Sequence, residues 1–483
     1  MEMNSKLSAP VDGFASFPAA EKSSRIRERT ALSLERIVFF GILVTGALTA
    51  IPYGTVEPWW EAAFVSLVFA FTALRIVHAL LTGQAHIKGH HLFFPLLCVC
   101  ALALFQVLPL FPMATGSTIS TDPLETIRFV FKLLAFISAG ELLLRFTSTR
   151  ARFVTLVYVV IGVGVASASF GLLRQFTQTE GSFLLRGLTA GTGYGQFINV
   201  NHFAFLMEMT LGVLAGRIAG KGIDSRRRPM AWALALLVWT ALVLTNSRGG
   251  VISMVSLMLF IAFVTVNDRS GRKANHFSPR RLSWVFDSSR RILRSAVALV
   301  VLALILTVAV VWVGGDSVVS RMETVSGEVS FDTTDKIRRI EIWRATLSLI
   351  KDHPIAGVGF GGYWTAIPRY FRGSGDWSLQ QAHNDYLEIA ASGGLIGAVL
   401  FLWFTVGVVV TAIKSRSSRD LFYRASHLGA LAGLIAVAVH SFVDFGLHTT
   451  INAMVFVMLI VILSTNQNSE EASSLLLRRQ SNG

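Results

Sequence analysis

The feature that most constrains the fold is a series of long apolar runs, separated by polar connections, that continues through most of the chain. A helix needs roughly 20 apolar residues to cross a hydrocarbon core about 30 Å thick. Applying that length gives about twelve spans, near 35–53, 59–81, 92–112, 127–146, 152–174, 201–218, 230–246, 250–266, 294–314, 384–413, 424–443 and 450–466. We therefore predict an all-α, polytopic helical membrane protein.

Composition agrees with this class. The chain is 53% hydrophobic and 15% charged, against about 25% charged residues in soluble proteins. Its net charge of +14 comes from short Lys and Arg clusters between the apolar runs, so we expect contact with membrane lipid and no nucleic acid. Cys98 and Cys100 lie in one span and point to different sides of a helix, so neither a disulfide nor a metal pair is expected.

The basic clusters occur in every second connection, and this alternation predicts how the spans are oriented. They are Arg25 to Arg29, Arg145 to Arg152, Arg226 to Arg228, Arg269 to Arg291, Lys414 to Arg419, and Arg478 with Arg479. Because Lys and Arg are retained on the cytoplasmic side, both termini are predicted to be cytoplasmic, in a bacterial inner membrane. We expect a disordered cytoplasmic N-terminus at 1–34, a transmembrane domain at 35–466 whose first helix is retained rather than cleaved, and a cytoplasmic tail at 467–483.

The alternate connections, at 175–200, 246–250, 315–383 and 444–449, are therefore predicted to be periplasmic, and they hold most of the polar motifs. In the large periplasmic segment 315–383, apolar residues recur at helical spacing from Ile337 to Ile350, which predicts an interfacial helix ended by Pro354. The run Gly357 to Gly362 fits G-x-G-x-x-G, but no strand precedes it, so a dinucleotide site is rejected. A close backbone approach or a flexible lid is expected instead.

Two of these periplasmic positions are candidates for chemistry. His383 precedes Asn384 and Asp385, which suit a helix N-terminus, while an imidazole at the membrane boundary is suited to accept a proton from a hydroxyl. The residues alone do not favour the helix N-terminus over the general base, or the reverse. Arg248 lies in a turn beside two glycines, and we favour phosphate binding over snorkelling to lipid headgroups.

We expect further polar residues at the predicted membrane boundary either to face a polar cavity or to form interhelical hydrogen bonds. They are Asn201, His202, Asp444 and His448. We assign His78, His427 and His440 to packing or interhelical hydrogen bonds. The histidines lack ligand spacing and a Walker A motif is missing, so we expect neither a metal site nor any other cofactor.

Five segments resemble, in order, the O-antigen ligase and O-antigen polymerase superfamily of polytopic membrane glycan transferases. They are Asn199–Ala204, Asn246–Gly250, Asp352–Gly361, His383–Leu387 and His440–His448. The most specific match is a His followed by Asn, then nine residues, then Gly-x-x-Gly, which here is His383, Asn384 and the glycines Gly394 and Gly397. These glycines are expected to let the helix pack closely and hold His383 in place.

The resemblance implies an inverting glycosyltransferase that needs no metal or nucleotide. Its donor is a glycan linked to undecaprenyl diphosphate, and its acceptor is a sugar hydroxyl on a glycan or lipid-linked partner, in O-antigen, capsule or exopolysaccharide biosynthesis. It implies that His383 is the base and that Arg248 binds the diphosphate, with Arg339 as the preferred second arginine. We expect the remaining polar residues to support the site or bind substrate: Asn384, Asp385, Asn201, His202, Asp444 and His448.

Two alternatives stay open at this point. A ligase and a polymerase share the donor chemistry and differ in the acceptor, which the sequence does not identify. A secondary transporter of a small solute also fits many spans with polar residues, although no repeat relates the two halves of the chain. The sugar and the oligomeric state are not encoded in any feature of the sequence.

Overall fold

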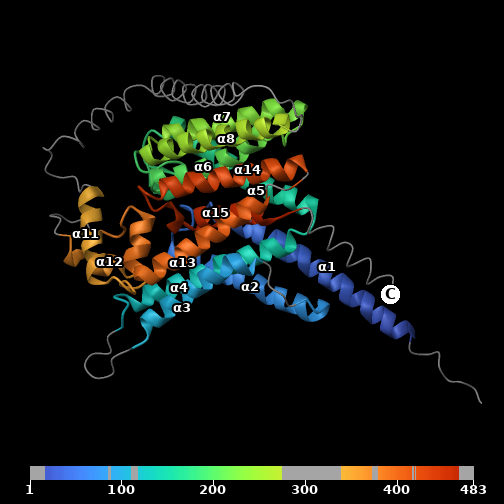
Figure 1. Cartoon of the computed structure of the whole chain (residues 1–483), viewed down its shortest axis with the longest axis horizontal. Coiled ribbons are helices and arrows are strands. Elements are labelled where there is room, and N and C mark those ends of the chain that lie inside the picture. Colours follow the sequence, from blue (N-terminus) through green and yellow to red (C-terminus); the bar gives the residue numbers. More distant parts are fainter. Residues whose placement is uncertain are drawn as a thin grey trace, which may run out of the picture.

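The computed structural model describes residues 17–84, 89–109, 118–274, 339–371, 379–415, 418 and 420–466. Long helices pack side by side in one bundle (Figure 1). They are α1 Phe17–Leu48, α2 Pro58–Thr82, α3 His90–Val107, α4 Pro123–Phe146, α5 Arg150–Thr177, α6 Val200–Ala219, α7 Arg228–Leu244, α8 Arg248–Ala274, α13 Asp385–Ser415, α14 Leu421–His440 and α15 Thr450–Ser464. Every predicted span coincides with one of these helices except 294–314, which lies outside the described residues.

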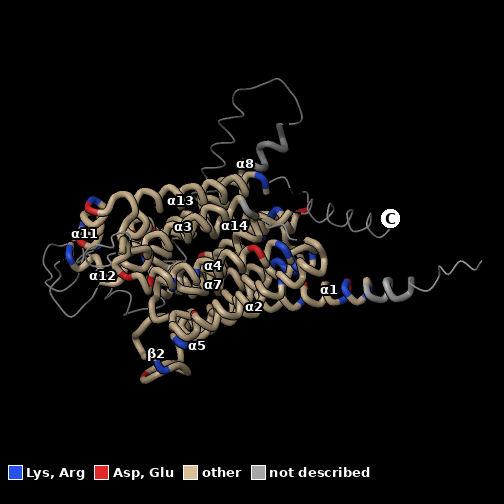
Figure 2. Tube along the Cα trace, turned by 90° about the horizontal axis from the view of Figure 1, so that it is seen from below, with Lys and Arg blue, Asp and Glu red and all other residues tan. Residues whose placement is uncertain are grey.

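The described helices have the length and composition of membrane spans. Eight are long and apolar enough to cross a bilayer, and two shorter apolar helices cover His91–Val107 and Thr450–Ser464. Most described charged residues lie toward the two ends of the bundle, with few between them (Figure 2). The chain is therefore a helical membrane protein. The full number of twelve spans is not established by the described residues.

Two features of the polar segments were not expected from the sequence. Within the segment 1–34, α1 begins at Phe17; Ala, Glu, Lys and Arg favour helix and extend the apolar span toward the N-terminus. The connection at 175–200 contains a short hairpin, β1 Ser182–Phe183 and β2 Leu185–Thr189, in a fold that is mostly helical. Arg174, in the last turn of α5, holds this connection by donating to the carbonyl oxygens of Thr189, Thr192 and Gly195 at 2.7–2.8 Å.

A helix was predicted at 337–350, and one is present as α11 Arg339–Asp352. Two short helices follow it, α12 Tyr363–Ala366 and η2 Ile367–Arg369. In Figure 1, α11 lies at one end of the bundle and crosses the direction of the long helices. We call this the α11 end. α13 starts and α14 finishes there, so the polar residues at those helix ends face the same region.

The two central helices, α6 and α14, touch through their backbones. A Cβ atom on Gly216 would lie 2.2 Å from Cα of Gly429, and one on Gly212 would lie 2.6 Å from the backbone nitrogen of Gly433. Small residues that allow such contact are a common device for packing helices in membranes. This contact brings Asn201, at the start of α6, close to Asp444, which follows α14.

A break in α13 receives the glycine-rich loop. Gly394 has φ 60° inside the helix, and a Cβ atom there would lie 2.3 Å from the carbonyl oxygen of Ile355. The carbonyl oxygens of Ala391 and Ser392 accept hydrogen bonds from the backbone nitrogens of Val358 and Gly359, each at 3.0 Å. The segment 357–362 therefore forms a close backbone contact, and of the two expected roles this is the one observed.

Candidate active site at the α11 end

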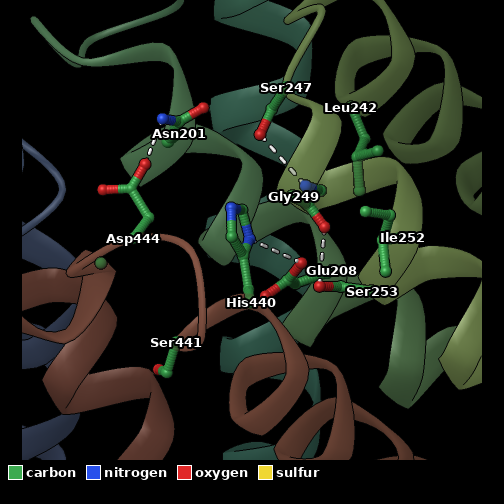
Figure 3. A network of polar contacts seen from close by, with 12 residues as sticks. Asn201, Glu208, Leu242, Ser247, Gly249, Ile252, Ser253, His440, Ser441 and Asp444 are labelled. Carbon is green, nitrogen blue, oxygen red and sulfur yellow. Dashed lines mark hydrogen bonds and ion pairs between the residues drawn. The ribbon is translucent and has the colours of Figure 1, made fainter. Parts of the chain in front are cut away.

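The carboxylate of Asp444 is the centre of a polar cluster at the α11 end. Its side chain is 1% exposed and lies in the turn between α14 and α15. The backbone nitrogen of Phe445 donates to Asp444 Oδ1 at 2.9 Å, and Asn201 Nδ2 donates to Asp444 Oδ2 (Figure 3). Burial alone would raise the pKa of Asp444, but the neighbouring His383 imidazole, the Phe445 amide and His202 outweigh burial and lower its pKa. Asp444 is therefore an ionised, buried carboxylate.

His383 and Arg339 approach this carboxylate from different segments. His383 Nδ1 lies 3.6 Å from Asp444 Oδ1, and the imidazole is 31% exposed. Arg339, the first residue of α11, places one terminal nitrogen 3.6 Å from Asp444 Oδ2 while its side chain stays 44% exposed. Two cationic or protonatable groups thus share one buried anion, and both remain accessible from outside.

The two residues after His383, Asn384 and Asp385, have different partners. Asn384 caps α13, since its side-chain oxygen accepts from the backbone nitrogens of Tyr386 at 3.0 Å and Leu387 at 3.1 Å, which confirms the cap interpretation. Asp385 accepts a hydrogen bond from Ser441 Oγ at 2.7 Å. The carboxylate that faces the His383 imidazole is therefore that of Asp444, and Asp385 has a separate partner.

A second imidazole with two carboxylates lies at the other end of the same turn. His448 Nε2 is 3.6 Å from both Asp385 Oδ1 and Glu388 Oε1. At 3.6 Å, the same separation as between His383 and Asp444, these groups are within ion-pair range but beyond hydrogen-bond distance. Lys132 of α4 supports the turn by donating to the carbonyl oxygen of His448 at 3.0 Å.

Phe445 is the functional residue that sequence reasoning missed most clearly. Its ring lies edge-on to the imidazoles of His202 and His383, with 4.9 Å between ring centroids in each case, and 5.6 Å from that of His448. It therefore fixes three histidines from three segments. The only signal in the sequence is its position between Asp444 and His448.

Arg248 begins α8 beside this cluster, and its side chain is exposed. Asn246 before it has φ 54°, and Ser247 Oγ accepts from the backbone nitrogen of Gly250 at 3.1 Å. Gly249 packs against His440 and Val443 at the end of α14. The structure thus brings Asn201, Arg339, His383 and Asp444 into contact and places the start of the Arg248 helix next to the same turn.

The histidines that we assigned to interhelical contacts have them. His440 Nδ1 lies 3.1 Å from Glu208 Oε2 on α6, and the two ring nitrogens of His427 contact the carbonyl oxygens of Ser415 and Thr465 at 3.1 and 2.9 Å. His78 of α2 lies 3.4 Å from Glu35 of α1. These contacts confirm that interpretation.

The fold and the site together define a polytopic helical membrane protein with an imidazole, a buried carboxylate and exposed guanidinium groups at one end of the bundle. Residues 233–402 match the family model described as O-antigen ligase. This region contains Arg248, Arg339 and His383, and the match confirms the resemblance to the O-antigen ligase superfamily. It supports glycan transfer of the ligase or polymerase type. No curated protein matches the chain.

Proposed function

We propose that this protein transfers a glycan from an undecaprenyl diphosphate carrier to an acceptor sugar hydroxyl on the periplasmic side of the bacterial inner membrane, in the synthesis of a surface polysaccharide. The observation that carries the proposal is the contact between His383 and the buried carboxylate of Asp444. A carboxylate at Nδ1 favours a proton on that nitrogen and leaves Nε2 as the base.

The reaction is an inverting displacement at the anomeric carbon of the donor sugar. The acceptor oxygen forms a bond to this carbon while its proton passes to Nε2 of His383. The bond between the anomeric carbon and the diphosphate oxygen breaks, and the electron pair leaves with the diphosphate. The imidazolium that forms on His383 is stabilised by ionised Asp444.

The diphosphate leaving group needs positive charge where its own negative charge develops. Arg339 uses one terminal nitrogen toward Asp444, so the other N–H groups of its guanidinium are available to phosphate oxygens. Arg248, at the start of α8, supplies a second guanidinium and lies near the positive end of that helix. With these two residues, the chain's own side chains provide the electrostatic stabilisation.

The acceptor sugar is bound on the side of His448. Asp385 Oδ1, Glu388 Oε1 and His448 Nε2 converge without hydrogen bonding to one another, and such groups hydrogen-bond sugar hydroxyls in pairs. His202 and Asn201 support the site from α6. Asn201 holds Asp444 directly, and His202 packs against Phe445.

The test is glycan transfer by the purified protein in lipid nanodiscs, supplied with a polyprenyl-diphosphate glycan and an acceptor. The wild type should transfer the glycan, and His383→Ala should lose about 10²-fold or more of the rate because the base is missing. His353→Ala is the matched control, since His353 is an exposed histidine just after α11, and it should keep the wild-type rate. Undiminished transfer by His383→Ala contradicts the assignment of the base.

A deletion strain that lacks the protein distinguishes a ligase from a polymerase. Short, unpolymerised units on immunoblots indicate a polymerase, and long glycan that stays on the carrier indicates a ligase. Solute flux in proteoliposomes without any glycan donor would instead support a transporter.

A further inference from the structure

Glu208 and His440 form a buried polar pair that has no role in the proposed mechanism. Glu208 of α6 and His440, the last residue of α14, are 0% and 1% exposed, and His440 Nδ1 lies 3.1 Å from Glu208 Oε2 (Figure 3). Burying a carboxylate and an imidazole together is unfavourable unless each satisfies the other. The glycines of α6 and α14 already bring the two backbones into contact. Glu208 and His440 are therefore not needed to hold these helices together.

The imidazole of His440 is held rigidly in one orientation. It stacks on Phe205 with 4.1 Å between ring centroids and 17° between planes, and its Nδ1 faces Glu208. The opposite edge of the ring, with Nε2 and Cδ2, faces Gly249. A Cβ atom on Gly249 would lie 2.5 Å from both of these ring atoms, so the ring leaves room only for glycine.

Gly249 directly follows Arg248, so the ring of His440 sets where the first turn of α8 lies. Gly249 is also held from its other side, because Ser253 Oγ donates to its carbonyl oxygen at 2.8 Å (Figure 3). The Glu208 carboxylate therefore orients an imidazole, and the imidazole supports the backbone that carries Arg248.

The backbone of His440 is tied to the rest of the site. Its carbonyl oxygen accepts from the backbone nitrogens of Val443 at 2.9 Å and Asp444 at 3.1 Å. The next residue, Ser441, accepts from the backbone nitrogen of Asp385 at 2.9 Å. The consecutive residues His440 and Ser441 thus join the helix of Arg248, the turn of Asp444 and the segment that follows His383.

We infer that Glu208 and His440 are positioning residues: through Gly249 they hold Arg248 at the distance from Asp444 and His383 that the donor diphosphate requires. This inference rests on the proposed function, which gives Arg248 its role. Neither residue touches substrate. Disturbing the pair should therefore weaken the use of the donor and leave the acceptor's binding groups, Asp385, Glu388 and His448, in place.

The experiment is a double-mutant cycle on Gly249→Ala and His440→Ala, with KM measured separately for donor and acceptor. Each single variant should raise the donor KM about tenfold or more, since small misplacements of binding groups are costly, and should leave the acceptor KM within about twofold. His440→Ala opens the space that the added methyl group of Gly249→Ala needs, so the double variant should be no worse than the worse single variant. Gly162→Ala is the matched control, because nothing lies within 4 Å of a Cβ atom there.

Conservative replacement of Glu208 keeps the inference testable if His440→Ala does not fold. Glu208→Gln retains an oxygen that accepts from Nδ1–H of His440, so its donor KM should lie between those of the wild type and Glu208→Ala. Effects of Gly249→Ala and His440→Ala that multiply, or equal rises of both KM values, overturn the inference while wild-type transfer still supports the proposed function. A wild type that transfers no glycan overturns the proposed function itself.

Discussion

Three side chains from distant parts of the chain meet at the carboxylate of Asp444. Asn201 belongs to α6, Arg339 to α11 and His383 to the segment before α13, and each contacts a carboxylate oxygen. Because Asp444 is buried and ionised, its charge is poorly screened and acts strongly on its neighbours. At the residue scale, the proposed mechanism therefore makes the reactivity of His383 depend on Asp444 more than on the residues that adjoin it in sequence.

Replacing Asp444 with Asn tests this dependence. The amide keeps the shape of the side chain but removes the anion that stabilises the imidazolium of His383, so the transfer rate should fall about 10²-fold or more. Asp352→Asn is the control, because Asp352 is exposed and accepts from the Tyr370 hydroxyl at 2.8 Å, away from His383; it should transfer at the wild-type rate. Equal initial rates of glycan transfer in the two variants would show that the Asp444 charge is not used.

The residue scale is also where the sequence was least informative. Asn201 and Asp444 could be proposed because polar residues at membrane depth are costly and few. His383 was proposed from its place at the membrane boundary and from the family motif, and Arg339 from the family resemblance. The pairing of His383 with Asp444 rather than with Asp385 could not be proposed, because it depends on how α13 and α14 meet in space. Glu208 gave no signal, since a single carboxylate inside an apolar run has no recognisable partner until α6 is placed against α14.

At the scale of the elements, α13 is the helix whose shape matters most. Its length was predictable from hydropathy and its Gly-x-x-Gly motif from sequence spacing, but the break at Gly394 was not. The break exists because Ile355 and its neighbours occupy the space beside it, and Gln106 of α3 completes the contact by donating to the carbonyl oxygens of Ala356 at 2.6 Å and Ser392 at 2.9 Å. The broken helix thus holds residues 354–360 against the bundle.

Gly394→Ala should destabilise the protein through this break. Alanine is strained at φ 60°, and its Cβ atom would lie 2.3 Å from the Ile355 carbonyl oxygen, so we expect the free energy of unfolding to fall by about 2–3 kcal/mol. Gly397→Ala is the control from the same motif, because its Cβ atom would make an ordinary contact at 3.4 Å with Phe360. Denaturant unfolding in detergent compares the two, and equal midpoints would contradict the role given to Gly394.

At the scale of the whole molecule, the lengths of the apolar runs predicted nearly all of the long described helices, because a bilayer imposes one length on every span. The basic clusters carry the separate prediction of orientation, because they mark the cytoplasmic connections. The same rules predict that the α11 end faces the periplasm. The hairpin of β1 and β2 and the connection between α6 and α7 should then lie on opposite sides of the membrane.

Cysteine labelling in intact cells measures this orientation after Cys98 and Cys100 have been replaced. Leu184→Cys, in the hairpin at a position that is 82% exposed, should react with a membrane-impermeant maleimide. Arg226→Cys, in the exposed connection between α6 and α7, should react only after the cells are opened. The reverse pattern would place the site on the cytoplasmic side and contradict the proposed donor side.

The contact of Gln106 with the glycine-rich loop also imposes an order on how the chain is made. Its partners Ala356 and Ser392 follow it by 250 and 286 residues. At roughly 5–20 residues per second, synthesis of that intervening chain takes about 10–60 s. Throughout this interval α3 is already available for insertion, and its buried amide has neither of these acceptors. More than half of the protein's length is therefore made after α3 before the Gln106 side chain can form these two hydrogen bonds.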